Sequence, residues 1–365
     1  MLNLKSILRK PYSVMIMSGV LMSVLVACGS DAETNETEDD GSTEVTATED
    51  QELVVYSSRN EKFVQNLLDK FESDTGIEVL VSHLDENAVN LLKEEANNTQ
   101  ADIFISNDIG GLEHLRAEGL LQGYTPEGIE TIDENYRADD NSWIGLSART
   151  RVLMYNKDLV SEDEVPTSIE ELADPQYEGE FAITRGGNGG FISHVSALRN
   201  EWGDDKTLEW LSSVKDNAGI IAQGNGDIRR SVGAGEIAFG LVNNYYYHQQ
   251  LEEPMDNNVG VVYPDQGEDQ MGAVINAAGV GFINDAPNEE SAQVFLDWIL
   301  EPENQKVFSF DSMEVPINTD IEAYEHAAPL DSYKVQDMPL SQLGEVWEDT
   351  RQLIEESGLD LEIGS

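Results

Sequence analysis

The chain of 365 residues contains a single cysteine, five histidines and 21 basic residues against 71 acidic ones, giving a formal net charge of −50. One thiol cannot form an internal disulfide, so the folded part must depend on core packing alone. The shortage of Lys and Arg excludes a nucleic-acid partner, since phosphate neutralisation requires clustered basic side chains. HExxH, GxSxG and CxxC motifs are absent and the histidines are scattered, so we expect that the protein is not an enzyme.

A long apolar run occupies residues 12–27, after three basic residues. It is too short for a membrane-spanning helix and has the flanks of a cleavable signal peptide, which we assign to residues 1–27. The run ends in Leu-Val-Ala-Cys, with Cys28 last, and this resembles a bacterial lipobox. We therefore predict cleavage before Cys28 and acylation of its thiol, so that a lipid anchor of the palmitate type holds the protein on the extracytoplasmic side of the cell membrane.

The segment 28–51 has almost no large aliphatic side chains, Val45 being the exception. Its Asp, Glu, Ser, Thr and Gly residues cannot bury enough apolar surface to offset the entropy of ordering, so we expect a disordered acidic tether. The remaining residues, about 310 in number, are too many for one small core and predict two lobes.

Strands and helices alternate after the tether. Leu53–Tyr56 is a short apolar strand, and the polar loop 57–60 separates it from a segment with helical spacing. A second apolar strand at 102–105 ends in the polar residues 106–108. This order predicts parallel sheets in an α/β fold. Because ligands bind at the carboxyl ends of strands in such sheets, we expect the two polar loops to meet at one rim.

Glycines cluster at residues 186–190, between the apolar strand Phe181–Thr184 and a segment with helical spacing. Glycine lets backbone N–H groups approach an anion closely, although a glycine-rich turn without a ligand is the more common case. Two further apolar segments, at 147–155 and 278–283, are interpreted as strands that cross between the lobes.

Three consecutive tyrosines, Tyr245, Tyr246 and Tyr247, follow the buried strand predicted at 236–242. A phenolate is a hard anionic ligand, and a strong Lewis acid such as Fe(III) lowers the pKa of a phenol as zinc lowers that of water. The tyrosines could equally pack on a helix with their hydroxyls reaching water. From these residues alone the two interpretations are about equal.

Five segments carry a more specific signal: Val54–Arg59, Ala101–Phe104, Arg149–Val152, Asp227–Glu236 and Asn243–Tyr246. Through them the chain resembles the bacterial ferric-iron-binding proteins of ABC importers, within the periplasmic-binding-protein superfamily, from about residue 52 to its end. The Asn-Asn-Tyr-Tyr motif is the most specific, being the iron-ligand pair of that family. The resemblance implies the type II fold: two α/β lobes, each a mainly parallel sheet flanked by helices, joined by two hinge strands.

The resemblance also implies a site. Tyr245 and Tyr246 would be the metal ligands, and carbonate, phosphate or citrate would complete the coordination of Fe(III). The anion would be held by Arg59, Gly187, Asn188, Gly189 and Gly190. Relatives place a third ligand where this chain has Asn60, Asn107, or Gly190 and Phe191, so no third protein ligand is inherited. Further cleft residues are expected at Asn60, Asn107, Asn244 and His248, of which His248 would either bind the metal or only support the site.

The sequence thus predicts a lipid-anchored, monomeric solute-binding protein that captures Fe(III) and delivers it to an ABC permease in the cytoplasmic membrane. We expect one lobe from residues 52–148 and 279–325, a second from 149–278, and a C-terminal helical segment, 326–365, packed on the lobes. Two alternatives stay open. The same fold could bind a small organic anion or a polyamine, and a secreted hydrolase is the less favoured reading, because carboxylates are abundant enough to supply an acid–base pair.

Overall fold

The computed structural model describes residues 51–84 and 87–361. The predictions for the signal peptide, for Cys28 and for the tether up to residue 50 lie outside these residues. Within the described part, none of the helices combines the length and apolar character needed to cross a membrane.

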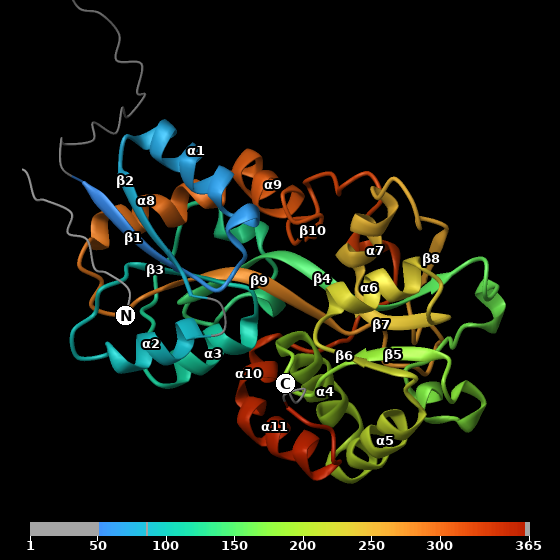
Figure 1. The fold of residues 1–365 in the computed structure, drawn as a ribbon. Coiled ribbons are helices and arrows are strands. Elements are labelled where there is room, and N and C mark those ends of the chain that lie inside the picture. Colours follow the sequence, from blue (N-terminus) through green and yellow to red (C-terminus); the bar gives the residue numbers. More distant parts are fainter. Residues whose placement is uncertain (1–50, 85–86, 362–365) are drawn as a thin grey trace, which may run out of the picture. The chain divides into compact units, whose positions relative to one another are not determined.

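The first lobe is built from the strands β1 (Glu52–Ser57), β2 (Glu78–His83), β3 (Ile103–Ser106) and β9 (Ile275–Phe282) and the helices α1 (Gln65–Thr75), α2 (Ala88–Glu94), α3 (Ile109–Ala117), α8 (Glu289–Ile299) and α9 (Pro302–Phe310). The strands lie in the order β2-β1-β3-β9 (Figure 1). β1 is parallel to both of its neighbours, whereas β9 is antiparallel to β3. One cluster of buried apolar side chains fills this lobe, as expected for helices packed on a sheet.

The second lobe contains the strands β5 (Phe181–Thr184), β6 (Ile220–Ala222), β7 (Phe239–Asn243) and β8 (Val259–Val262) and the helices α4 (Gly189–Trp202), α5 (Asp204–Asn217), α6 (Asn225–Gly233) and α7 (Asn244–Leu251). β5 is parallel to both β6 and β7. Two apolar clusters, one on each face of the sheet, form its core.

The strand β4 (Trp143–Asn156) runs through both lobes and is buried along its whole length. Up to Thr150 it pairs with β9, and from Arg151 it pairs with β7. Its side chains alternate between faces, so that Val152 and Leu153 enter different clusters of the second lobe. The predicted pair of crossing strands is therefore β4 and β9, and the change of partner falls at Thr150 and Arg151.

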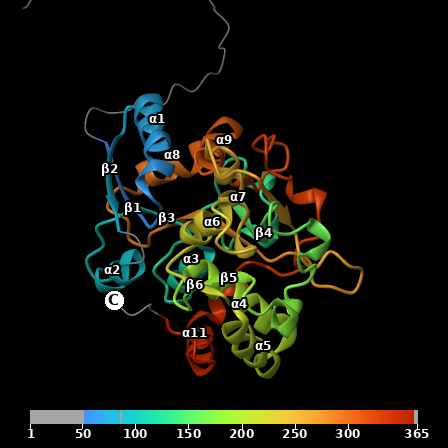
Figure 2. The same cartoon turned by 45° about the vertical axis from the view of Figure 1, so that its right-hand side comes forward.

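The C-terminal part touches helices of both lobes. β10 (Val315–Pro316) pairs with β4, and α10 (Ser341–Glu345) packs on α3. α11 (Trp347–Glu356) packs on α4 and α5 (Figure 2). Short 3-10 helices lie at Glu61–Phe63, Ile129–Thr131, Glu134–Tyr136, Glu162–Glu164, Glu170–Ala173, Pro175–Tyr177 and Leu330–Ser332.

The three tyrosines lie in the first two turns of a helix, not along the end of a strand. β7 ends at Asn243 and α7 begins at Asn244. The side-chain oxygen of Asn244 accepts hydrogen bonds from the backbone N–H groups of Thr150 and Tyr245, both at 3.0 Å. The asparagine therefore ties the start of the helix to β4, and helical geometry separates the directions of neighbouring tyrosine side chains by about 100°.

A buried ion pair joins the loop after β1 to the segment before β10. Both terminal nitrogens of Arg59 donate to Glu314 Oε2 at 3.1 Å, and the two side chains are 0% and 2% exposed. The hydroxyl of Ser147 on β4 donates to the same carboxylate. The Arg59 guanidinium also lies 4.6 Å from the ring centre of Phe308, a cation–π contact. Arg59 is thus part of the core of the first lobe.

We predict that Glu314→Gln lowers the free energy of unfolding by roughly 3 to 5 kcal/mol, because it leaves the Arg59 charge buried without its counter-charge. Urea unfolding measures the loss. The matched control is Glu170→Gln, which breaks the exposed pair with Lys206 and should change stability by less than about 1 kcal/mol. Equal losses in the two variants would contradict the structural role of Glu314.

Candidate functional site

The paired tyrosines line a cavity of about 580 Å³. Tyr245 is 6% exposed, Tyr246 is partly buried, and their ring centres lie 4.3 Å apart with 31° between the planes. Residues of both lobes complete the wall, among them Asn107 and Asp108 from the first and Gly189 from the second. The two predicted metal ligands therefore lie side by side at one cavity.

Tyr245 does not ionise readily by itself. Burial raises its pKa well above the ordinary value, and the neighbouring Tyr246 raises it further, while the positive charge of Arg149 acts in the opposite direction. At neutral pH the phenol is therefore protonated. A phenolate forms there only when a cation replaces the proton, as a strong Lewis acid does.

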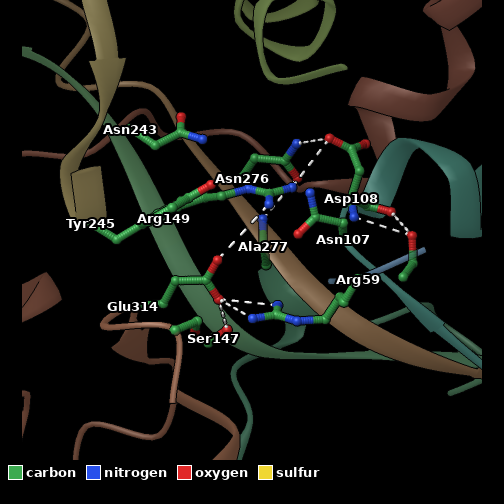
Figure 3. Close-up of polar contacts among 12 residues, drawn as sticks. Arg59, Asn107, Asp108, Ser147, Arg149, Asn243, Tyr245, Asn276, Ala277 and Glu314 are labelled. Atoms are coloured by element: carbon green, nitrogen blue, oxygen red, sulfur yellow. Dashed lines mark hydrogen bonds and ion pairs between the residues drawn. The ribbon is translucent and has the colours of Figure 1, made fainter. Parts of the chain in front are cut away.

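Arg149 on β4 is the positive group in the cavity wall. Its guanidinium lies 3.5 Å from Asp108 Oδ2 and 3.9 Å from Glu314 Oε1 (Figure 3). Burial lowers its pKa, but the negative charges of Glu314 and Asp108 act in the opposite direction, and the pKa lies above the ordinary value. Arg149 therefore remains positive beside the phenols.

A second arginine, Arg151, lies behind the wall. It donates to the side-chain oxygens of Asn225 and Asn243, both at 3.1 Å, and to the carbonyl of Leu241 at 3.1 Å. Burial lowers its pKa to about 9, so it stays charged at neutral pH. Because the two amide oxygens face Arg151, the NH₂ groups of Asn225 and Asn243 are free to donate elsewhere along the cavity that both residues line.

Asp108 links the two lobes at the cavity. It caps α3 by accepting from Gly110 N–H at 2.7 Å, and its other oxygen accepts from the Ser193 hydroxyl on α4 at 2.9 Å and from the amide of Asn276 on β9. Burial raises the pKa of Asp108, against the lowering effect of Arg149 and these donors. Both oxygens of Asp108 are therefore hydrogen-bonded, and these bonds connect α3 and β9 of the first lobe to α4 of the second.

The glycine-rich loop offers fewer donors than the sequence suggests. The N–H of Gly187 donates to the carbonyl of Leu361 at 3.0 Å, and that of Asn188 donates to the backbone carbonyl of Arg185 at 3.2 Å. Gly189 and Gly190 are the first two residues of α4 and line the cavity. Helix geometry leaves their N–H groups without intrahelical partners, so these two can meet an anion.

Arg59 and Asn60 do not line the cavity within the described residues. Glu314 turns the Arg59 side chain into the core of its lobe. The side chain of Asn60 caps a 3-10 helix by accepting from Lys62 N–H at 3.2 Å. The arginine that lines the cavity is instead Arg149. The sequence did not identify Arg149 as a site residue.

Asn244 and His248 also lie away from the cavity in the described part of the chain. Asn244 is buried and bonds to backbone. His248 is buried, with Nδ1 at 2.8 Å from the carbonyl of Met313, and burial lowers its pKa to about 4. Asn107, by contrast, is exposed at the cavity, with its N–H donating to the Ser58 hydroxyl at 2.9 Å.

Several cavity residues were missed from the sequence, and they come from segments that lie far apart in the chain: Arg149, Asn225, Trp347, Glu348 and Arg351. One usable signal was the pair of arginines within an otherwise apolar strand, Arg149 and Arg151, in a chain poor in basic residues. Among the described residues, no three His, Cys, Asp or Glu side chains gather as a metal site.

Known proteins resemble this chain over most of its length. Residues 98–336 match the family model described as bacterial extracellular solute-binding protein. The chain is 31% identical to iron uptake protein A1 of Synechocystis sp., over 85% of this chain and 88% of that protein. It is 27% identical to the major ferric iron-binding protein of Neisseria meningitidis, over 84% and 93% of the two chains.

Solved structures of similar fold are of the same kind as the sequence relatives, being iron-binding proteins by their names. Iron-bound HitA from Pseudomonas aeruginosa superposes with a TM-score of 0.79 and 26% identity, covering 85% of this chain and all of that one. A Trichodesmium protein in complex with iron and citrate gives 0.76 and 28%, with the same coverage. These relatives are solute-binding transport proteins, not enzymes, and their fold is the type II periplasmic-binding-protein fold. The chain therefore belongs to the bacterial extracellular solute-binding proteins.

Proposed function

We propose that the protein captures Fe(III) outside the cytoplasm through the phenolates of Tyr245 and Tyr246 and hands it to an ABC permease. The observation that carries the proposal is the pair of phenols, 4.3 Å apart at their ring centres, in the wall of a cavity shared by two lobes. Relatives named for iron uptake and for ferric-iron binding support the same cargo.

The protonation of the phenols and the charge of the metal together favour a trivalent cargo. Both phenols must lose a proton to become anionic ligands, and the raised pKa of Tyr245 means that a weak Lewis acid does not displace that proton at neutral pH. Fe(III) is a hard, highly charged ion and suits phenolate oxygen. Arg149 in the cavity wall adds a positive charge that stabilises the phenolates once they form.

We propose that an exogenous anion, such as carbonate, phosphate or citrate, fills the remaining coordination positions. Its negative charge would be met by Arg149 and by the N–H groups of Gly189 and Gly190 at the start of α4. Arg59 is left out of this revised anion site because Glu314 already binds it.

The remaining parts of the proposal concern transport. Acylation of Cys28 would anchor the protein to the cell membrane, with residues 28–51 as a tether. The lobes, taken as 52–148 with 279–325 and as 149–278, would close around the ferric site by bending at β4 and β9. A closed monomer, with residues 326–365 packed on it, would then be recognised by the permease.

We predict that the double variant Tyr245→Phe, Tyr246→Phe binds Fe(III) at least about 100-fold more weakly than the wild type and lacks the visible phenolate-to-iron charge-transfer band, because both anionic ligands are gone. Absorption spectra during titration with ferric citrate test this. Tyr247→Phe is the matched control and should keep the band, since Tyr247 does not line the cavity within the described residues. An unchanged band in the double variant would remove the proposed ligands, and binding of iron-free citrate alone would favour an organic anion as cargo.

A second prediction concerns protons. Because the pKa of Tyr245 lies well above its ordinary value, coordination at neutral pH must release its proton, so lowering the pH should weaken binding by about tenfold per pH unit for each proton released. Calorimetry of ferric citrate binding in two buffers of different ionisation enthalpy counts the protons. We expect a net release of one or more per iron in the wild type and in Tyr247→Phe. Binding without proton release would mean that the phenols stay neutral.

A further inference from the structure

The C-terminal helix α11 forms one wall of the cavity. Trp347, Glu348 and Arg351 all line it. A Cβ atom added at Gly110 would meet the Trp347 ring at 2.6 Å, and one at Gly189 would lie 3.9 Å from it. The indole therefore packs between the first turns of α3 and α4, one from each lobe, and it fixes α11 beside the site.

Arg351 has no polar partner in the described residues, although the chain holds 71 acidic side chains. Every other arginine of the described part has one: Arg59 with Glu314, Arg116 with Glu113, Arg137 with Asn141, Arg149 with Asp108, Arg151 with Asn243, Arg185 with Leu361, Arg199 with Asp204, Arg229 with Glu253 and Arg230 with Asp227. Glu348 lies three residues before Arg351 on the same helix, a spacing that permits an ion pair, yet the pair does not form. The guanidinium of Arg351 is thus available to bind a ligand in the cavity.

The cavity is also larger than a metal ion with one small anion requires. Its volume of about 580 Å³ falls in the range of roughly 300 to 1,000 Å³ typical of sites for small organic molecules. Two further nitrogen-bearing side chains in the wall, Lys93 and His114, already lie against Glu118 at 2.8 and 3.2 Å. Arg149 is 3% exposed at its side chain, whereas Arg351 is less deeply buried, so the two arginines offer an inner and an outer positive group.

We infer that the cavity takes iron as a ferric chelate that carries a carboxylate beyond those bound to the metal, and that Arg351 binds this outer carboxylate. The inference rests on the proposed function, since the tyrosines hold the iron of the same complex. A guanidinium suits the role because its parallel N–H groups match the two oxygens of a carboxylate. Arg351 would then be a specificity-determining residue, which distinguishes an iron polycarboxylate from iron held with carbonate alone.

The test compares two iron sources on the full-length protein. One is ferric citrate, titrated by the charge-transfer band and by quenching of tryptophan fluorescence. The other is Fe(II) oxidised by air in bicarbonate buffer without organic acid, scored as iron bound per protein. Arg351→Gln should raise the Kd for ferric citrate by about tenfold, as expected for one charged hydrogen-bonded pair, and should leave the iron bound from bicarbonate unchanged.

Two further variants keep the result interpretable. Arg351→Lys retains the charge and should recover part of the affinity for ferric citrate. Lys206→Gln removes one positive charge on α5, where Lys206 pairs with Glu170, and should bind both iron sources like the wild type. The inference is overturned if Arg351→Gln binds ferric citrate within about twofold of the wild type, or if it loses both sources equally. If the wild type itself gives no charge-transfer band with either source, the proposed function fails first, and this outcome is distinct from the other two.

Discussion

A phenol that is buried next to another phenol keeps its proton, and the site depends on this constraint. Tyr245 lies in the cavity wall with its pKa raised by burial and by Tyr246, so the empty cavity carries no phenolate there at neutral pH. An ion that is charged enough to displace the proton gains an anionic ligand, and a weaker ion gains none. If the protein binds Fe(III) as proposed, discrimination in favour of a hard trivalent metal would follow from the desolvation of the tyrosine as much as from the oxygen atom itself.

The positive and negative groups around the tyrosines are arranged along the strands that join the lobes. Arg149 lies on β4 just before the strand changes partner from β9 to β7. Glu314 holds both Arg59 and the other side of Arg149, and Asp108 connects Arg149 to Ser193 on α4. A movement of one lobe against the other would therefore change the contacts of the same charged groups that face the ligand. These contacts form a short chain of ion pairs and hydrogen bonds that includes groups of both lobes beside the cavity.

Local sequence patterns predicted the elements well because each pattern has a local cause. Apolar runs identified β1, β3, β5 and both crossing strands, and the Asn-Asn-Tyr-Tyr motif led to the two tyrosines at the cavity. What the sequence could not supply were partners far away in the chain. Arg59 was expected at the anion site, but Glu314 directs it into the core. The N–H of Gly187 was expected to be free, but the carbonyl of Leu361 accepts from it. Neither contact could be predicted from the residues that flank Arg59 or Gly187, because each partner lies more than 150 residues away in the chain.

The central claim is that two neighbouring phenolate oxygens bind one trivalent metal ion between the lobes. The most direct measurement is a crystal structure of the iron-loaded protein, with the metal located by anomalous diffraction at the iron absorption edge. The account predicts one iron peak within bonding distance of the Oη atoms of Tyr245 and Tyr246, with non-protein oxygens at the other positions. An iron peak elsewhere, or a cavity filled by an organic molecule without a metal, would contradict it.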